Sequence, residues 1–210
     1  PLCGEPAAGP PGLAVRWGKA RRRYHLCPAC RLIHLDPGDR LDSASEAQRY
    51  RLHRNSPRDE GYRAFLGPLV AELVERLASG ARGLDFGCGP EPVLAELLSR
   101  HGFACDLYDP LFHPQPPAPP YDFIAASEVF EHFHHPAREM ERWRTLLRPG
   151  GLLGIMTERW ESLEFFARWP YTSDPTHVCF LHDATLDWIS RHLDLEERGR
   201  TRRTVVWARR

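Results

Sequence analysis

The sequence predicts an α/β fold built on a doubly wound, mostly parallel sheet. Residues 84–90, LDFGCGP, form the end of a strand that runs into a glycine turn, and apolar side chains then recur at helical spacing over residues 92–98. Residues 103–109 form a second short strand, and residues 121–127 and 152–157 are further apolar runs of strand length. The chain has 210 residues and is 42% hydrophobic, which suffices for one ordinary domain with a small addition.

The glycine turn and a downstream acid indicate a ligand that contains a nucleoside. Glycines let a ligand approach the backbone closely, and the helix that follows presents free N–H groups at its N-terminus. The second strand ends at Asp109, 20 residues beyond Gly89. A carboxylate at this place can accept both hydroxyls of a ribose. The alternative is an ordinary α/β turn followed by a solvated acid.

Four stretches, taken in order, resemble the motifs of class I S-adenosylmethionine-dependent methyltransferases. They are residues 84–89, Asp109, residues 121–133 (YDFIAASEVFEHF) and residues 146–153 (LLRPGGLL). The resemblance covers roughly residues 60–210 and implies a Rossmann-like fold and an enzyme that uses S-adenosylmethionine as methyl donor. NAD-binding proteins share the first two features but lack the Leu-Arg-Pro-Gly-Gly turn. One departure is Glu91, which stands where the family often has a third glycine.

The resemblance also implies which residues hold the cofactor. They are Asp85, Gly87, Cys88, Gly89, Asp109, Pro110, Leu111, Phe112 and Ser127. Residues 110–120 contain too many prolines for a helix or a central strand. The family normally has a helix and a third strand there, so we expect both to be missing and the strand that ends at Asp109 to lie at a sheet edge. Leu111 and Phe112 would then cover the adenine ring; alternatively, Phe112 only shields the sheet edge.

The N-terminal part carries cysteines at metal-binding spacing. Residues 27–30, CPAC, form one complete Cys-X-X-Cys turn, and residues 1–4 are the second half of another, whose first cysteine would lie just upstream. Two such turns form a zinc ribbon, in which thiolates bind Zn²⁺ tetrahedrally. We therefore predict a structural zinc site with the ligands Cys3, Cys27 and Cys30. The fourth ligand stays open between His25, His34 and the upstream cysteine, and the alternative is a pair of buried cysteines without metal.

Two helices are predicted between this ribbon and the glycine turn. Ser43 and Glu46 have the spacing of a capping box for a helix that runs to about Arg54, and residues 59–78 are amphipathic at helical spacing. In the related methyltransferases such helices form a lid over the cofactor. Tyr50 and His53 share one helix face, so they either line the site or pack as ordinary helix residues.

The C-terminal half predicts the remaining elements. Residues 129–147 predict a helix with a break at Pro136, and residues 160–169 and 183–192 predict two shorter helices. The last two strands, 193–197 and 204–208, predict an antiparallel hairpin. We divide the chain into a zinc-ribbon-like segment (1–40), an N-terminal helical lid (41–80) and an S-adenosylmethionine-binding domain (81–210).

Four side chains are candidates for the chemistry: Glu128, Glu131, His132 and His177. The first three share one face of the predicted helix after the strand 121–127, at the sheet edge where open α/β sheets bind ligands. His177 lies in a loop that reaches the same crevice. Two carboxylates and two imidazoles suit Mg²⁺, Mn²⁺ or a similar ion. The alternative is that His132 acts as a general base without metal.

This pattern resembles the metal site of small-RNA 2′-O-methyltransferases, and a similar one occurs in ubiquinone-pathway O-methyltransferases. In those enzymes the metal orients and acidifies the hydroxyl that is methylated. The resemblance implies the same chemistry for Glu128, Glu131, His132 and His177.

Composition limits the choice of partners. The formal net charge is zero, so no long-range field attracts nucleic acid or a membrane, and no apolar run reaches the about 18 residues of a membrane span. Six unevenly placed cysteines indicate a reduced, cytoplasmic protein. We predict methyl transfer to a small-molecule or carrier-bound acceptor, on oxygen. The alternatives are a metal-dependent methyltransferase of RNA ends and a non-catalytic module that binds cofactor and interacts with a partner.

Overall fold

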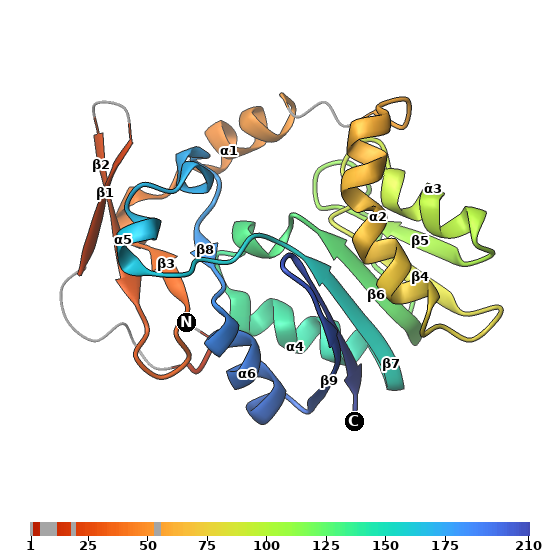
Figure 1. Ribbon diagram of the computed structural model, residues 1–210. Coiled ribbons are helices and arrows are strands. Elements are labelled where there is room, and N and C mark those ends of the chain that lie inside the picture. Colours follow the sequence, from red (N-terminus) through yellow and green to blue (C-terminus); the bar gives the residue numbers. More distant parts are fainter. Residues whose placement is uncertain (1, 5–11, 18–19, 53–55) are drawn as a thin grey trace.

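The computed structural model describes residues 2–4, 12–17, 20–52 and 56–210, and these form an α/β molecule with a large and a small sheet (Figure 1). The large sheet has six strands, in the order β5 (Ala104–Tyr108), β4 (Arg82–Phe86), β6 (Tyr121–Ser127), β7 (Leu147–Met156), β10 (Thr204–Arg209) and β9 (Leu195–Arg200). The first four strands are parallel, and β10 pairs antiparallel both with β7 and with β9. The predicted fold class and the closing hairpin are confirmed.

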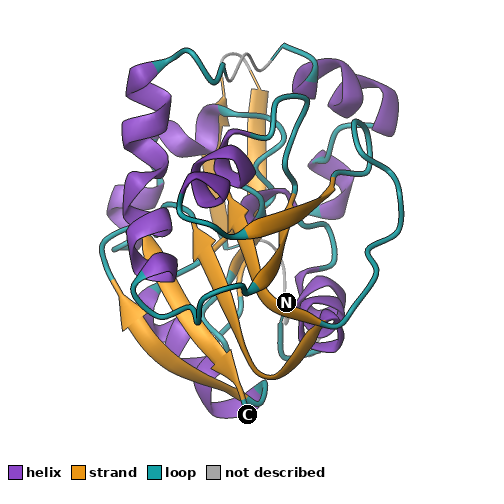
Figure 2. Cartoon of the chain, turned by 90° about the vertical axis from the view of Figure 1, so that its right-hand side faces the viewer, coloured by secondary structure: helices purple, strands orange, loops and turns teal. Residues whose placement is uncertain are grey.

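Helices cover both faces of the large sheet, as Figure 2 shows from the side. On one face α2 (Glu60–Val74) and α3 (Val93–Arg100) pack on Phe123, Met156 and Val206. On the other face α4 (Pro136–Leu146) and α6 (Asp183–His192) pack on strand residues that include the fully buried Trp207. The sheet is therefore doubly wound, and its cofactor edge is the one at which β4, β5 and β6 end.

The sheet is shortened where the prolines predict it. Among the described residues, β5 pairs with β4 alone and lies at the sheet edge. The proline-rich segment that follows Asp109 forms no helix or strand, and only an isolated bridge joins Asp109 to His113. The Tyr121 hydroxyl fixes the end of this segment, because it accepts a hydrogen bond from Ala118 N–H (2.9 Å) and donates one to Asp106 (2.8 Å). The expected absence of a third strand agrees with this topology.

The small sheet joins the N-terminal strands to a short strand from the C-terminal half of the chain. Its strands are antiparallel, in the order β1 (Leu13–Trp17), β2 (Ala20–Leu26), β3 (Ile33–Leu35) and β8 (Cys179–Phe180). The core of this sheet is aromatic, with Tyr24, Trp160, Phe166 and Phe180 buried together. The segment 1–40 is thus not closed on itself, because its sheet takes a strand from the C-terminal part.

The lid helices begin and end differently from the prediction. The first, α1, spans Ser43–Tyr50, and its N-cap is Asp42, which accepts hydrogen bonds from the N–H groups of residues 44 and 45. The predicted capping box was wrong, because the aspartate one residue earlier satisfies these donors. The second, α2, starts after the N-cap Asp59 and ends at Val74. His53 lies outside the described residues.

The predicted helix over 129–147 is two elements. A 3₁₀ turn, η2 (Phe130–His132), is followed by extended residues, and α4 starts at Pro136. The break predicted at Pro136 is confirmed, because this proline starts α4, whereas the residues before it form no α-helix.

Three shorter helical elements complete the described structure: η1 (Pro37–Asp39), α5 (Leu163–Phe166) and η3 (Pro170–Ser173). The helix α6 has the predicted bounds, and its N-cap is the His182 side chain. No helix in the described part of the chain is both long and apolar enough to cross a membrane.

Candidate active site

The glycine turn lies between β4 and α3, at the sheet edge where the sequence places the cofactor. Gly87 and Gly89 both have positive φ angles, +75° and +66°. A Cβ on Gly87 would lie 2.4 Å from Val129 Cγ2, whereas a Cβ on Gly89 would meet nothing within 4 Å. Gly87 is therefore required by packing, and Gly89 faces open space of the kind that a ligand fills.

Asp85 lies beneath this turn rather than in the crevice. It is 2% exposed, and its Oδ2 accepts a hydrogen bond from Ala95 N–H (3.0 Å) in the first turn of α3. Burial raises the pKa of Asp85 to about 7. The residue thus ties α3 to β4 and supports the glycine turn from below.

Asp109 joins the two backbone turns on which a nucleoside would lie. Its Oδ2 accepts a hydrogen bond from Gly89 N–H (3.1 Å), and its Oδ1 accepts from the N–H groups of Leu111 (2.8 Å) and Phe112 (3.1 Å). An ionised carboxylate has about four acceptor positions, so capacity remains for a ribose hydroxyl. Leu111 is 43% exposed, which leaves its side chain accessible for contact with an adenine ring.

Polar atoms without partners mark the end of β6. Among the described residues, the buried Ser127 Oγ and Glu128 Oε1 have no hydrogen-bond partner. Buried polar groups are almost always hydrogen-bonded, so these two atoms could pair with polar groups of a cofactor. Together with the open space at Gly89 and the capacity of Asp109, they fit a cofactor that is polar along its length. Cys88 is a neutral thiol here, because burial raises its pKa.

Three of the four candidate side chains converge. One ligand atom each from Glu131, His132 and His177 lies within 4.8 Å of the others, and the two imidazole centroids are 4.9 Å apart. Glu131 and His132 come from η2, and His177 comes from the loop before β8. The structure thus brings together groups that are more than 40 residues apart in sequence.

Both imidazoles are oriented by backbone carbonyls. His132 Nδ1 lies 3.0 Å from the Thr176 carbonyl, and His177 Nδ1 lies 2.7 Å from the Tyr171 carbonyl. A carbonyl oxygen can only accept, so each Nδ1 carries a hydrogen. Burial lowers the pKa of His177, which keeps this ring neutral. Neutral imidazoles of this tautomer are typical of metal ligands and of proton acceptors.

Glu128 does not belong to this group but is linked to it through Tyr171. The Tyr171 hydroxyl oxygen lies 2.9 Å from Glu128 Oε2 and also bonds Glu131 Oε1, while Thr157 Oγ1 donates to Glu131 Oε2 (3.0 Å). Burial, with the charge of Glu131 second, raises the pKa of Glu128 to about 9. Glu128 is therefore protonated at neutral pH.

Helix α1 packs next to His132. The Tyr50 ring packs edge-on against His132, with centroids 5.2 Å apart, and the Tyr50 hydroxyl donates to Glu46 (3.0 Å). Glu46 also forms an ion pair with His134 (3.3 Å). Of the two roles considered for Tyr50, the structure supports the one that lines the site.

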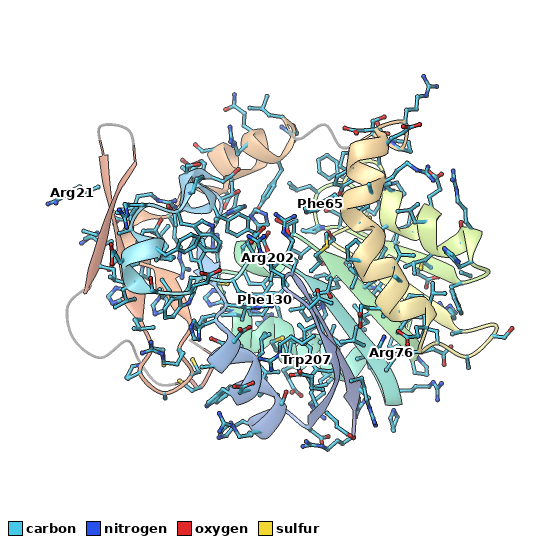
Figure 3. All side chains as sticks on the ribbon, in the orientation of Figure 1. Arg21, Phe65, Arg76, Phe130, Arg202 and Trp207 are labelled. Atoms are coloured by element: carbon cyan, nitrogen blue, oxygen red, sulfur yellow. The ribbon has the colours of Figure 1, made fainter. Side chains whose placement is uncertain are left out.

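The small sheet holds the loop that carries His177. The Arg22 guanidinium is buried and donates to the carbonyls of Asp174 (3.3 Å) and Pro175 (2.8 Å). Its neighbour Arg21 points away from the molecule (Figure 3). Sequence reasoning missed Arg22 because three arginines stand in a row, and only the strand register shows which of them faces inward. Tyr171 was missed because nothing in its loop marked it as a polar link.

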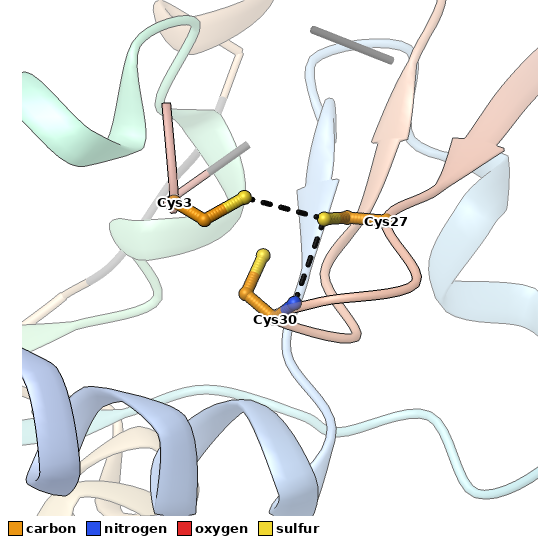
Figure 4. A group of neighbouring side chains, drawn as sticks. All are labelled: Cys3, Cys27 and Cys30. Carbon is orange, nitrogen blue, oxygen red and sulfur yellow. Dashed lines mark hydrogen bonds between the residues drawn. The ribbon is translucent and has the colours of Figure 1, made fainter. Parts of the chain in front are cut away.

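The three predicted thiol ligands gather at one point (Figure 4). Cys3 Sγ lies 3.4 Å from Cys27 Sγ, Cys30 N–H donates to Cys27 Sγ (3.5 Å), and the three sulfurs lie within 4.8 Å of one another. In the described part of the chain no histidine joins them. His25 is instead bonded to Asp36 (2.9 Å) and His34 stacks on His25, so neither is the predicted fourth ligand.

Comparisons with known proteins agree with the fold. The profile of a family described as a methyltransferase domain matches residues 58–197. None of the curated sequences compared with the chain matches it. A solved structure of 1,6-didemethyltoxoflavin-N1-methyltransferase from Burkholderia thailandensis, with its substrate and S-adenosylhomocysteine bound, is 14% identical with a TM-score of 0.59 and covers 94% of this chain and 99% of its own. Magnesium protoporphyrin IX methyltransferase from Synechocystis PCC 6803, with S-adenosylhomocysteine bound, is 12% identical with a TM-score of 0.50 and covers 80% of this chain and 95% of its own.

Proposed function

Because the chain belongs to the methyltransferase family and is a class I enzyme that uses S-adenosylmethionine, we propose that it methylates a hydroxyl oxygen of a small-molecule or carrier-bound acceptor. The observation that carries the proposal is the convergence of Glu131, His132 and His177 at the end of β6. An oxygen nucleophile must lose its proton during methyl transfer, and this cluster offers the groups that can take it. A thioether or a neutral amine would need no such cluster.

The chain aligns the reactants. When bound, S-adenosylmethionine supplies a methyl group on a positively charged sulfur, which reacts by in-line displacement. Gly89 lets the cofactor approach the backbone, the remaining acceptor positions of Asp109 suit the ribose hydroxyls, and Ser127 Oγ can pair with a polar group of the cofactor. Holding donor and acceptor in line accounts for a large part of the acceleration, because alignment replaces a bimolecular encounter.

The residues around Glu131 fit a divalent cation. Glu131, His132 and His177 would hold it, and such an ion lowers the pKa of a hydroxyl bound to it. With Glu128 protonated and outside the group, the donors are two imidazoles and one carboxylate. This set favours Mn²⁺ or another transition metal over Mg²⁺, which prefers oxygen ligands. Tyr171 and Thr157 orient the Glu131 carboxylate by hydrogen bonds.

The test is product detection with the labelled methyl donor and a metabolite extract, with and without a chelator. We expect a methylated product that forms only when metal is present, and recovery on addition of Mn²⁺. Turnover that resists the chelator would instead favour His132 Nε2 as the proton acceptor. If the purified protein binds no S-adenosylmethionine, both enzyme mechanisms are wrong and a non-catalytic role is favoured.

The variant His177→Ala separates chemistry from cofactor binding. We expect it to abolish turnover and to leave the dissociation constant of S-adenosylmethionine nearly unchanged, because His177 lies on the acceptor side of the crevice. His192→Ala is the matched control, since that histidine also bonds a carbonyl through Nδ1 (2.8 Å) but is exposed on α6. Equal activity of both variants would exclude His177 from the reaction.

A further inference from the structure

We propose that Cys3, Cys27 and Cys30 bind a Zn²⁺ ion that fixes the loop of His177 through the small sheet. The first half of the proposal concerns a metal site and stands by itself. The second half deepens the proposed function and rests on it, because it gives the ribbon a positioning role for a residue of the active site.

The cysteine cluster has the geometry of a thiolate metal site. Cys27 and Cys30 lie at the two ends of a tight turn in which Arg31 N–H donates to the Cys27 carbonyl (2.9 Å) and Cys27 N–H donates to the Leu32 carbonyl (2.9 Å). Cys30 N–H points at the Cys27 sulfur (3.5 Å), as backbone donors do around metal-bound thiolates. The left-handed backbone of Arg31 (φ +59°) turns the chain back into β3.

Burial and ligand chemistry favour zinc. Cys27 is 4% exposed and Cys30 is fully buried, while Cys3 reaches them from a separate segment of the chain. Three soft thiolates in a small, closed site suit Zn²⁺, and hard ions such as Mg²⁺ prefer oxygen. The fourth tetrahedral position is left for solvent or for a ligand beyond the described residues.

Backbone hydrogen bonds lead from this site to His177. The metal-binding turn connects β2 to β3, and β3 pairs with β8. Leu35 N–H donates to the Val178 carbonyl (2.7 Å), and Val178 N–H donates to the Glu131 carbonyl (2.7 Å). Val178 thus bonds to β3 through its carbonyl and to η2 through its N–H, and these two bonds hold the adjacent His177 between the small sheet and η2.

Arg22 adds a second connection. It extends from β2 to two carbonyls of the loop, those of Asp174 and Pro175, three and two residues before His177. A buried guanidinium that donates to backbone carbonyls holds them in one arrangement. If the zinc site orders β2 and β3, it also orders the loop that sets the position of the His177 ring.

The metal site is tested by the zinc content of the purified full chain. We expect about one Zn²⁺ per chain in the wild-type protein and none in Cys27→Ala. Cys105→Ala is the matched control and should keep the zinc, because Cys105 lies on β5, away from the cluster. A wild-type protein without zinc, or one whose Cys3 and Cys27 are joined by a disulfide in non-reducing peptide mapping, overturns the proposal.

The coupling is tested by hydrogen exchange of the backbone amides before and after removal of zinc. We expect faster exchange at Leu35 and Val178 in the zinc-free protein and unchanged exchange in α3. Hydrogen exchange does not depend on turnover, so this test of the coupling remains valid even if the proposed reaction is wrong. Unchanged exchange at both amides would contradict the positioning role.

Arg22→Ala tests the same coupling with the cysteine turn intact. We expect a decrease of about 10- to 100-fold in kcat, full zinc content and an unchanged S-adenosylmethionine affinity. Arg22→Lys should recover part of the loss, since an ammonium can reach one carbonyl. The control Arg21→Ala should match the wild type, because Arg21 points into solvent (Figure 3). A loss of the same size in Arg21→Ala would overturn the role of Arg22.

Discussion

Asp109 does two things with one carboxylate. It organises the glycine turn through Gly89 N–H and the next turn through Leu111 N–H, and it is the expected partner of the ribose. Hydrogen bonds to charged groups contribute about 1.5–3 kcal/mol each, so their loss should be measurable in both roles. The Asp109 carboxylate should therefore contribute both to the stability of the cofactor-free protein and to the binding of the cofactor.

Asp109→Asn should weaken the binding of S-adenosylmethionine by about 10- to 100-fold and should also lower the melting temperature slightly, because the amide is a weaker acceptor for the backbone donors. Titration calorimetry with the methyl donor measures the first effect. Asp106→Asn on the same strand is the control, since Asp106 pairs with Tyr121 and Arg82 outside the crevice. An unchanged dissociation constant would remove Asp109 from the ribose role.

At the scale of elements, the two glycines of the turn between β4 and α3 have different roles: one is needed for packing and the other for access of the ligand. Gly87 and Gly89 both have left-handed backbones, but only Gly87 has a neighbour, Val129, in the space of a Cβ. A side chain in this conformation costs about 1–2 kcal/mol at either position, and the clash at Gly87 adds to it.

We expect Gly87→Ala to lower the free energy of unfolding by about 3 kcal/mol or more and Gly89→Ala by only about 1 kcal/mol. For cofactor affinity we expect the opposite order. Gly89→Ala should weaken cofactor binding more than folded Gly87→Ala does, because its added methyl group would occupy the space of the ligand. Chemical denaturation and calorimetry measure the two quantities. Equal effects of the two variants on both would contradict this division.

Elements with a strong local pattern could be predicted from the sequence, and those set by distant contacts could not. The strands 121–127 and 204–208 were apparent because they are mostly apolar, and the missing third strand followed from the prolines. The break at Pro136 followed from the proline, whereas the 3₁₀ turn before it, η2, could not be told from the first turn of a helix. The strand β8 was missed because two residues carry no periodicity, and only the partner β3 makes them a strand.

The same division applies to the candidate site. His132 and His177 could be named from residue type and order alone. Their orientation depends on the carbonyls of Thr176 and Tyr171, which every loop possesses, so it could not be predicted. The link of Glu128 to Glu131 through the Tyr171 hydroxyl likewise requires the folded loop.

The stability of the whole molecule should depend on pH through Asp85. Its pKa is raised from 3.8 to about 7, so the folded chain keeps a proton that the unfolded chain releases near pH 4. The free energy of unfolding therefore falls as pH rises from about 4 to 7, by about 4 kcal/mol from this group alone. Above that window the carboxyl is ionised in both states and its effect is constant.

Asp85→Asn should remove this dependence, because the amide can still accept from Ala95 N–H but does not ionise. We expect the variant to gain stability relative to the wild type as the pH rises from about 4 to about 8, as measured by urea denaturation at several pH values. Taking the difference cancels the other titrating groups. A difference that stays constant with pH would show that the folded and unfolded chains bind this proton equally.

The pairing of β3 with β8 also determines the order in which the chain can finish folding. Ile33 pairs with Phe180, so the small sheet cannot be completed until the chain between these two residues has been synthesised. Contacts this far apart in sequence form late, because a large loop must close first. The His177 loop joins the same sheet, whereas the parallel strands β4 to β7 end at Met156, so these strands can be in place before Glu131, His132 and His177 come together. A nascent chain would thus be able to hold cofactor before it can use it.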